Sequence, residues 1–198
     1  MDLNFTNKSV AVVGSSGNLL DHLYGEDIDK HDVIIRFNQA RVKGYEKHVG
    51  SRTDIRIMNT HTFGGSTGSD RFPKNDPDFS KKLKDQLILV NKTMDKKFCK
   101  QRAPNCKVGF IQDEFWVYCQ KLMNNAKEPS VGFLGVLIAV QTSPKINVYG
   151  FDQKHTAEKK HYWEEVKAVG TCHNFNVEKD VFKKLEEQKI IKVIWKKY

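Results

Sequence analysis

The sequence predicts an α/β fold in which helices flank a central, largely parallel sheet. Short apolar runs rich in β-branched residues recur along the chain, and helical patterns separate several of them. The first run ends in a glycine-containing turn that leads into a helical pattern. Strands that alternate with helices are typical of parallel sheets, because parallel neighbours need a crossover connection. At 198 residues the chain has the usual size of one compact domain, and we expect residues 1–198 to form it.

The strand pattern occurs seven times. Each segment is a short run of Val, Ile, Leu or aromatic residues between polar or glycine residues, as strands buried in a parallel sheet require. The predicted strands are 10–14, 32–38, 53–59, 86–91, 107–111, 146–151 and 192–196.

Helical patterns fall between several of these strands. The longest apolar stretch, 131–140, is too short to span a bilayer and has the length of a buried helix. Two segments have no period: 61–78, rich in Gly, Ser, Asp and Pro, is a predicted loop, and 91–105 is basic and irregular. Whether the loop at 61–78 closes over a bound ligand stays open. The predicted helices are 19–24, 79–84, 114–123, 132–142 and 177–188.

The bulk composition limits the classes of function. The formal net charge of +9 attracts polyanions, so a basic nucleic-acid-binding module is one reading of the chain. Residues 1–14 show no signal peptide, and we expect the chain as given to be soluble; an anchor upstream of Met1 stays an open alternative. The four cysteines lack zinc-site spacing, and Cys99 with Cys106 are either a small disulfide loop or free thiols.

The turn after the first strand, Gly14-Ser15-Ser16-Gly17, is the first candidate binding site. A strand that runs through glycine into a helix can aim backbone N–H groups at a phosphate, and the serine hydroxyls can donate as well. A plain tight turn is an equal alternative. The absence of G-x-G-x-x-G disfavours a nicotinamide oxidoreductase, and no P-loop motif occurs.

Two further polar positions lie near the second strand. Asp27 and Asp29 form a D-x-D pattern that resembles metal sites of nucleotide-sugar enzymes, but they precede the strand, whereas ligands in such folds bind at the carboxyl ends. We therefore expect no metal there. Asn38 does lie at a carboxyl end, and its amide can donate and accept, as recognition of a base or ribose requires.

The next candidates flank the apolar helix at 132–142. Ser130 occupies an N-cap position, which makes either a second anion site or simply a capped core helix. Gly150-Phe151, at the end of the following strand, offers close backbone approach and a flat apolar face at the same edge of the sheet.

His161 and His173 are the candidate proton-transfer residues. An imidazole can take or give a proton near pH 7 without much tuning, although a structural histidine is the commoner case. Together the motifs resemble the eukaryotic sialyltransferases (glycosyltransferase family 29), which are inverting enzymes that use CMP-activated sugars. Residues 10–56 are similar to that family's long motif, 129–152 to its short motif, His161-Tyr162-Trp163 to its third motif, and His173 with Glu178 to its very short motif, H-x-x-x-x-E.

The resemblance implies a single-domain, Rossmann-like glycosyltransferase, a GT-A variant, that moves a sialic acid or related keto-acid sugar from a CMP-sugar donor to a glycan hydroxyl without a metal or other cofactor. It implies that His173 deprotonates the acceptor, that His161 donates to the departing phosphate, and that Glu178 caps its helix and helps to hold the His173 loop. Nucleic acid is not an expected partner. The implied donor-binding residues are Ser15, Ser16, Gly17, Asn38, Ser130, Val131, Gly132, Gly150 and Phe151.

The chain departs from the family pattern at four positions. The family usually has Asn at Ser15 and Thr at Val131, and its long and short motifs carry a disulfide whose cysteine positions are Val10 and Ser143 here. Their joint loss fits a chain that folds in a reducing compartment, so a cytoplasmic location stands beside the Golgi location that the family implies.

CMP-Kdo is the alternative donor, and a CMP-sugar-binding protein without turnover is the alternative function. Acceptor, linkage and oligomeric state stay open, and 61–78 and 115–118 are candidates for the acceptor or sugar side.

Overall fold

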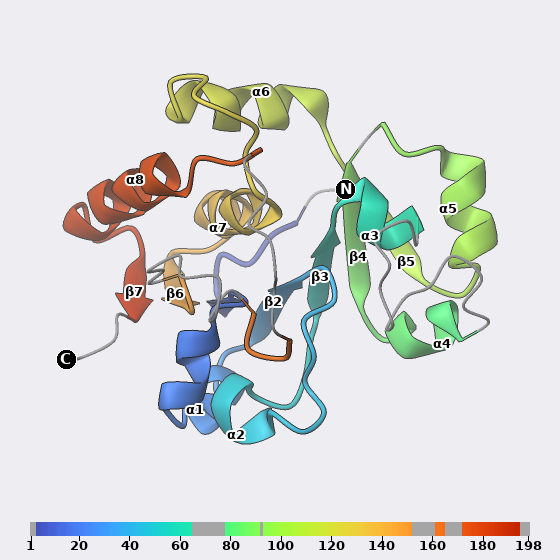
Figure 1. Cartoon of the computed structure of the whole chain (residues 1–198), viewed down its shortest axis with the longest axis horizontal. Helices are drawn as coiled ribbons and strands as arrows, with labels where there is room; N and C mark the ends of the chain where they lie inside the picture. The colour runs from blue at the N-terminus through green and yellow to red at the C-terminus, as the bar shows by residue number, and fades with distance from the viewer. Residues whose placement is uncertain (1–2, 65–77, 92, 152–160, 165–171, 195–198) are drawn as a thin grey trace.

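All seven predicted strands form, and they join in one parallel sheet (Figure 1). The computed structural model describes residues 3–64, 78–91, 93–151, 161–164 and 172–194. The strand order is β5-β4-β3-β2-β1-β6-β7, and every neighbouring pair is parallel, which confirms the predicted α/β class. The strands are β1 (Ser9–Val13), β2 (Val33–Phe37), β3 (Ile55–Met58), β4 (Leu87–Asn91), β5 (Lys107–Ile111), β6 (Lys145–Tyr149) and β7 (Lys192–Ile194).

The strand order reverses at β1. The chain runs outward from β1 to β5 and then returns to place β6 on the other side of β1. At this reversal the loops that follow two adjacent parallel strands leave in different directions and open a crevice at the carboxyl edge. The Gly14 N–H donates to Tyr149 O at 2.8 Å, so the ends of β1 and β6 stay joined where the crevice begins.

The predicted helices also form, with one change of type. The segment at 19–24 is a 3₁₀ helix, η1, that ends at Asp21. Four further helices had no helical period in the sequence, because each is seven residues or shorter. The helices are η1 (Gly17–Asp21), α1 (Gly25–Asp29), α2 (Glu46–Val49), α3 (Thr60–Gly64), α4 (Phe79–Leu83), α5 (Lys96–Arg102), α6 (Asp113–Leu122), α7 (Val131–Thr142) and α8 (Phe175–Glu187).

Two of these short helices correct the sequence prediction. Helix α5 lies inside 91–105, which was predicted to be irregular, and it begins because the Asp95 side chain accepts from Phe98 N at 2.6 Å. Helix α3 occupies the start of the predicted loop, 61–78, where the Asn59 side chain accepts from Thr62 N at 2.7 Å. Asp and Asn are favoured caps, and here the caps rather than apolar periodicity mark the helices. The rest of that loop, 65–77, lies outside the described residues.

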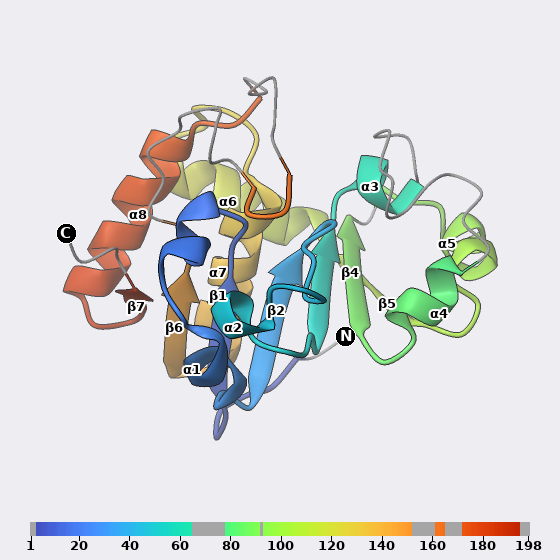
Figure 2. The same cartoon turned by 60° about the horizontal axis from the view of Figure 1, so that its bottom comes forward.

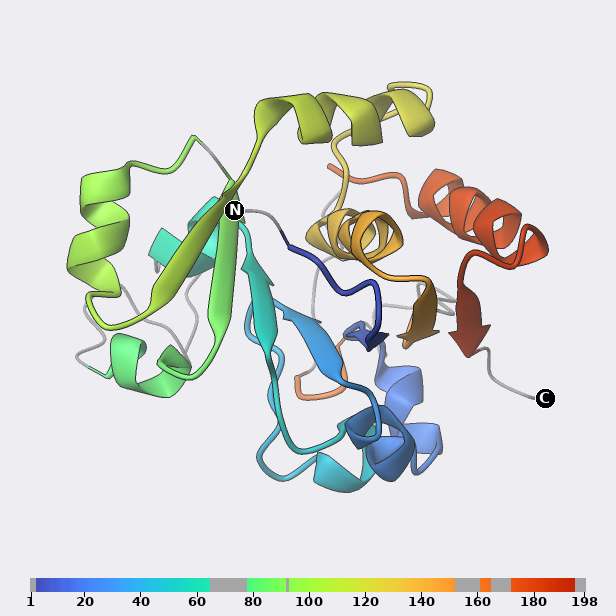
Figure 3. The ribbon, with the colours of Figure 1, turned by 180° about the vertical axis from the view of Figure 1, so that it is seen from behind.

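Helices cover both faces of the sheet (Figures 2 and 3). Alternate residues of a strand point to opposite faces, so Val10 and Val12 pack toward α6, α7 and α8, whereas Ala11 and Val13 pack toward η1, α1 and α2. Helices α3, α4 and α5 pack against the second face further along the sheet, where Ile88 contributes. The central strands β1, β2 and β3 are therefore enclosed on both faces, which explains their continuous apolar runs in the sequence.

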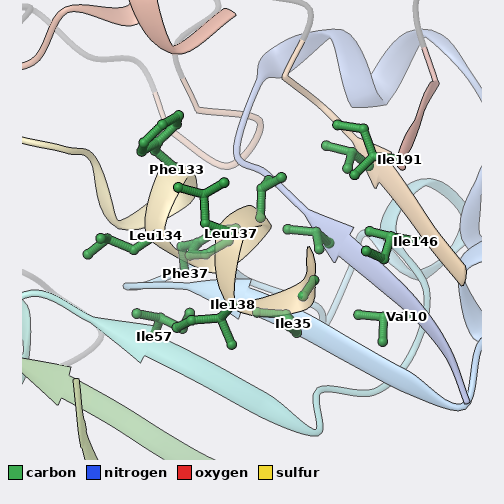
Figure 4. Packing of buried hydrophobic residues seen from close by; sticks show 14 of the residues in the cluster. Val10, Ile35, Phe37, Ile57, Phe133, Leu134, Leu137, Ile138, Ile146 and Ile191 are labelled. Carbon is green, nitrogen blue, oxygen red and sulfur yellow. The ribbon is translucent and has the colours of Figure 1, made fainter. Parts of the chain in front are cut away.

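Helix α7 lies over the middle of the sheet and is apolar on all sides (Figure 4). Phe133, Leu134, Leu137 and Ile138 fill the space above β1, β2 and β3, and in Figure 1 α6 lies above α7 and α8 lies beside it. This is the buried helix that the apolar stretch at 131–140 predicts. Among the residues that the structure describes, none belongs to a helix long and apolar enough to cross a membrane.

We expect Gly135→Ala to destabilise the protein. A Cβ at this position would lie 2.4 Å from Cε1 of the buried Phe37 ring and 3.1 Å from Ile57 Cδ1. Overpacking of this kind costs about 1–3 kcal/mol, which outweighs the gain of about 1 kcal/mol from placing alanine in a helix. Urea unfolding measures the change, and Gly64→Ala is the control, because among the described residues no atom beyond its own helix and chain neighbours lies within 4 Å of the added Cβ. Equal stability of the two variants would contradict the close approach.

The segments that carry the disulfide in the family are joined here by hydrogen bonds. Ser143 Oγ donates to Lys8 O at 2.7 Å, and Phe5 N donates to Thr142 O at 2.8 Å, so the end of α7 is tied to the residues before β1. Val10 and Ser143 are both buried. All four cysteines are free thiols, which settles the alternatives for Cys99 and Cys106 in favour of no disulfide.

Candidate functional site

A cavity of about 610 Å³ opens at the carboxyl edge of the sheet, over the reversal between β1 and β6. The wall brings together residues from segments far apart in the sequence: the ends of β1, β2 and β6, the beginning of α7, and the third and fourth family motifs. Every predicted site residue lines it except Ser16 and Gly17. Those that do are Ser15, Asn38, Ser130, Val131, Gly132, Gly150, Phe151, His161 and His173.

The floor of the cavity is built on glycines that touch other parts of the chain. A Cβ on Gly14 would lie 2.4 Å from Gly150 O, and a Cβ on Gly132 would lie 3.0 Å from the Phe151 ring. Gly150 has φ +71°, a conformation that side chains other than those of Asn and Asp rarely adopt, and a Cβ there would meet Leu19 at 2.7 Å. Gly14 needs glycine because the backbone of Gly150 lies against it, whereas side chains fill the space beside Gly132 and Gly150.

The predicted phosphate turn is only partly at the cavity. Ser15 lines it, and Ser15 O accepts from Tyr162 N at 3.0 Å. Ser16 is 2% exposed, and its hydroxyl oxygen accepts from Asn18 N at 3.3 Å to begin η1. Gly17 is buried as the first residue of that helix. The structure therefore does not bring Ser16 and Gly17 to the wall of the cavity, because both are used to turn the chain.

Asn38 is held in a defined orientation at the cavity. It follows β2 with φ +43°, a left-handed conformation that asparagine tolerates better than most residues. The buried Arg56 donates to Asn38 O at 2.8 Å, and Asn38 Oδ1 accepts from Asn59 N at 3.0 Å. Because Oδ1 already accepts from Asn59, the NH₂ group is the end that can donate to a ligand, whereas the amide was predicted both to donate and to accept; nucleotide binding by Asn38 stays a prediction.

Ser130 and Glu178 connect the beginning of α7 to α8. The Ser130 hydroxyl accepts from Phe133 N at 3.0 Å and caps α7, as predicted, and it donates to Glu178 Oε2 at 2.7 Å. Ser130 N donates to Glu178 Oε1 at 2.8 Å. The predicted role of Glu178 as the cap of its own helix is wrong, since Asn174 caps α8 through Val177 N. Glu178 instead fixes the loop before α7, which forms one wall of the cavity.

Burial raises the pKa of Glu178 to about 7, because the loss of solvation outweighs the two hydrogen bonds from Ser130 that favour the anion. The Glu178 residue is 3% exposed. An acid whose pKa is raised on folding adds stability below its unfolded pKa and loses it as the pH rises through the folded value. The loss is on the order of 3 kcal/mol between pH 4.5 and about 7.

We therefore expect Glu178→Gln to gain stability relative to the wild type as the pH rises from 5 to 8. Glutamine resembles the protonated acid and can still accept from Ser130 N, but it carries no charge to bury. Thermal unfolding at several pH values measures the difference, and Glu187→Gln, an exposed position on the same helix, is the control. A stability difference that stays constant with pH would contradict the buried, titrating carboxyl group.

The contacts of His173 define which nitrogen can act as a base. Its Nδ1 lies 2.8 Å from Glu128 O. A carbonyl oxygen only accepts, so Nδ1 carries the proton and Nε2 of the neutral ring has a free lone pair. The ring packs against Phe175 with a centroid separation of 5.6 Å, and both residues line the cavity. A ring with this tautomer can accept a proton at Nε2, and the role of His173 as the general base stays a prediction.

The Nδ1 atom of His161 faces a carboxylate rather than a carbonyl oxygen. Its Nδ1 lies 2.6 Å from Glu164 Oε1, and its ring stacks on Trp163 with centroids 4.5 Å apart and an interplanar angle of 8°. Tyr162, between them, fixes the segment through its N–H to Ser15 O and its hydroxyl to Arg41 O. A carboxylate only accepts, so the His161 ring donates its Nδ1 proton to Glu164, and its role toward the departing phosphate stays a prediction.

Sequence reasoning missed several residues of the wall. Two asparagines at strand ends line the cavity: Asn59 directly follows β3, and Asn91 is the last residue of β4. The rule that identified Asn38, a polar residue at the carboxyl end of a buried strand, would have found both. Trp163 and Glu128 also line it, but their places depend on loops whose courses no sequence pattern indicates.

The D-x-D carboxylates and the aromatic stretch 115–118 are the remaining candidates from the sequence. Asp27 accepts from the Tyr149 hydroxyl at 2.7 Å, and Asp29 accepts from Ser51 N at 2.9 Å, so both carboxylates of the D-x-D pattern hold tertiary hydrogen bonds. No cluster of three or more His, Cys, Asp or Glu placed to hold a metal occurs in the described parts of the chain. Within 115–118, Trp116 lines the cavity, whereas Tyr118 is 47% exposed.

Comparisons with known proteins point to one family. The family model described as "Glycosyltransferase family 29 (sialyltransferase)" matches residues 4–190 of the chain. The Gallus gallus protein named CMP-N-acetylneuraminate-beta-galactosamide-alpha-2,3-sialyltransferase 1 is 30% identical over 193 residues, covering 87% of this chain and 52% of its own. The Homo sapiens protein named beta-galactoside alpha-2,6-sialyltransferase 2 is 32% identical over 171 residues, covering 73% of this chain and 31% of its own.

The fold comparison agrees with the sequence comparison. A crystal structure of a mammalian sialyltransferase superposes with a TM-score of 0.70 at 23% identity, covering 96% of this chain and 70% of that one. This likeness shows that the arrangement of strands and helices is shared. The chain spans about half the length of the curated alpha-2,3 relatives that it matches.

Proposed function

Because the chain belongs to glycosyltransferase family 29, the sialyltransferases, we propose that it transfers a sialic acid from CMP-sialic acid to a hydroxyl of a glycan. The observation that carries the proposal is the pair of histidines at one cavity: His173 has its Nδ1 on a carbonyl and His161 has its Nδ1 on a carboxylate. One ring is set to accept a proton and the other to donate one, as a transfer between two oxygens requires.

CMP binds across the carboxyl edge in this proposal. The glycine floor at Gly14 and Gly150 lets the backbone approach the nucleotide, the Asn38 NH₂ donates to it, and Phe151 supplies an apolar face. Phe151 is itself supported edge-on by Phe37 and Phe182. The volume of about 610 Å³ suits a nucleotide with part of a sugar, since small-ligand sites commonly measure 300–1,000 Å³.

Transfer then exchanges one bond for another. His173 Nε2 takes the proton of the acceptor hydroxyl, and the acceptor oxygen bonds to the anomeric carbon on the face opposite the phosphate. The bond between the anomeric carbon and the phosphate oxygen breaks, and its electron pair leaves with CMP, whose new negative charge His161 stabilises. Attack opposite the leaving group inverts the anomeric configuration. Because His161 meets that charge, the reaction needs no metal.

The acceptor side of the proposal begins with galactose. The chicken and human relatives carry names that specify beta-galactosamide and beta-galactoside acceptors, with different linkages. Amides and aromatic rings are common in sugar recognition because they match hydroxyl groups and the apolar faces of the ring. Asn59, Asn91 and Trp116 supply both kinds of contact on the part of the wall near β3, β4 and α6.

The test is donor turnover by the purified chain with EDTA present throughout. CMP release is followed with CMP-N-acetylneuraminate and with CMP-Kdo, each with lactose and without an acceptor, and the anomeric configuration of the product is read by NMR. Faster release with CMP-N-acetylneuraminate and inverted product support the proposal. Preference for CMP-Kdo would replace the donor, and CMP binding without turnover on either donor would favour the binding protein that Ser15 and Val131 suggest.

A further inference from the structure

We propose that α4, α5 and the start of β5 form a surface that binds an anionic membrane. This surface lies at the β5 end of the sheet, and the transfer chemistry does not use it. The inference therefore goes beyond the proposed function, and its main test depends on neither donor nor acceptor. The exposed cations that make up this basic surface are Lys81, Lys82, Lys84, Lys96, Lys97, Lys100 and Lys107.

The positive charge of the described chain is concentrated in this region. Residues 78–91 and 93–111 carry eight Lys and Arg against three Asp. The other described residues together carry sixteen Lys and Arg against fifteen Asp and Glu, so they are almost neutral. The field of the protein is therefore strongest at one end of the sheet, where it attracts an anionic surface.

The two helices of the basic surface belong to one packed unit. Cys106 Sγ, just after α5, donates to Ser80 O on α4 at 3.3 Å. The Phe63 ring of α3 contacts Phe79 of α4 and Phe98 of α5, with centroids 5.3 and 6.3 Å away. Both helices lie at the same end of the molecule (Figures 1 and 3). Their charges therefore act on a partner together.

The outer face of α5 combines lysines with an exposed aromatic ring. Lys96, Lys97 and Lys100 are exposed, and Phe98, among them in the sequence, is 37% exposed. Cys99 is the buried residue of this helix. Lysines beside an exposed phenylalanine are typical of segments that lie on a membrane, because the ammonium groups meet anionic headgroups and the ring enters the apolar boundary.

The kind of cation favours a membrane over nucleic acid. Arg102 is the only arginine in 78–111, and it is used inside the protein: its Nε donates to Phe63 O at 2.5 Å, and its guanidinium lies 4.2 Å from the Phe79 ring centroid. Nucleic-acid sites favour arginine, whose planar fork binds one phosphate through two hydrogen bonds. Lysines are point charges on flexible stems, which suits a diffuse layer of headgroups.

The test is co-sedimentation of the whole chain with vesicles of phosphatidylcholine and phosphatidylserine, with pure phosphatidylcholine vesicles as the reference. A lysine near an anionic surface contributes about fivefold to the affinity. The α5 variant, Lys96→Gln with Lys97→Gln and Lys100→Gln, should therefore bind the mixed vesicles about 100-fold more weakly than the wild type. Binding of the wild type should also weaken as salt is added, because exposed charges are screened.

The α8 variant, Lys183→Gln with Lys184→Gln and Lys192→Gln, is the matched control. These three lysines are also exposed, so this variant loses the same net charge as the α5 variant. They lie in a segment with acidic residues such as Glu186 and Glu187, outside the basic surface. We expect the α8 variant to bind the mixed vesicles within about threefold of the wild type.

A second readout connects the surface to transfer and rests on the proposed function. Transfer to a lactose-bearing lipid in the mixed vesicles should fall in the α5 variant, because the chain no longer gathers at the membrane that holds the acceptor. Transfer to free lactose should not change, since none of the substituted lysines lines the cavity.

Four results decide between the alternatives. Weaker binding to the mixed vesicles in the α5 variant alone supports the proposal. Equal binding by the two triple variants, or no preference of the wild type for the mixed vesicles, would overturn it. Binding of single-stranded RNA in preference to vesicles, lost in the α5 variant, would assign the surface to nucleic acid instead. Vesicle binding without transfer to either acceptor would support the surface but overturn the proposed function, so the two failures are distinguishable.

Discussion

His173→Ala is expected to lower kcat for transfer by about 10²–10⁴-fold, the usual contribution of a general base. The acceptor hydroxyl would then have to lose its proton to water while its oxygen attacks the anomeric carbon. The affinity for CMP should change little, since the His173 ring is held by Glu128 O and Phe175 rather than by the glycine floor. A steady-state transfer assay and a CMP titration on the same sample measure the two quantities.

His48→Ala is a matched control for this variant. The His48 Nδ1 lies 2.7 Å from His22 O, so it makes the same kind of ring-to-carbonyl contact, but it lies on α2 and away from the cavity. We expect it to retain full transfer activity. If His173→Ala kept more than half of the wild-type rate, another group would have to be the base, and the assignment of His173 would fail.

His161→Ala is expected to lower kcat by about 10²–10³-fold, the usual effect of removing a group that stabilises developing negative charge. CMP should also bind more weakly, since the product's phosphate faces the same ring. Single-turnover rates and a CMP titration check these expectations.

His161→Gln separates charge from hydrogen bonding. Glutamine can donate to the phosphate but carries no charge, so it should recover a few-fold of the rate lost in His161→Ala. Full recovery of the wild-type rate would show that charge at this position is not required, and that another group meets the leaving phosphate.

The sheet could be predicted from the sequence because its strands are buried on both faces. Residues such as Val10, Ala11, Val12 and Val13 are apolar without alternation, and a short run of this kind between turns has few other interpretations. The strand order could be placed only through the family resemblance, since hydrophobicity shows which residues are buried but not which strands are neighbours.

Helix α5 and the end of helix η1 could not be predicted in the same way. Helix α5 buries only Cys99 among its seven residues, so it has no apolar stripe, and its beginning depends on one side-chain cap, from Asp95. Helix η1 ends after Asp21, although the apolar pattern continues to Leu23, which is 72% exposed. In both segments local hydrogen bonds determine the structure, and hydrophobic periodicity reports only on packing.

The candidate site was predictable where a motif gives a residue its place at the end of a strand or helix. Asn38, Ser130 and Gly150 meet at the cavity for this reason. The prediction failed where a side chain's partner comes from elsewhere: Ser16 is used to begin η1, and Glu178 reaches Ser130, 48 residues away, instead of capping α8. Such pairings depend on how helices pack over the sheet, and one sequence does not contain that information.

The measurement that tests the central claim most directly is a crystal structure of the chain with CMP bound. We predict that the cytosine and ribose lie over Gly150 and Phe151, with Asn38 donating to the nucleotide, and that the phosphate lies within hydrogen-bonding distance of His161. CMP bound at another surface, or bound here with its phosphate away from His161, would contradict the assignment of this cavity as the donor site.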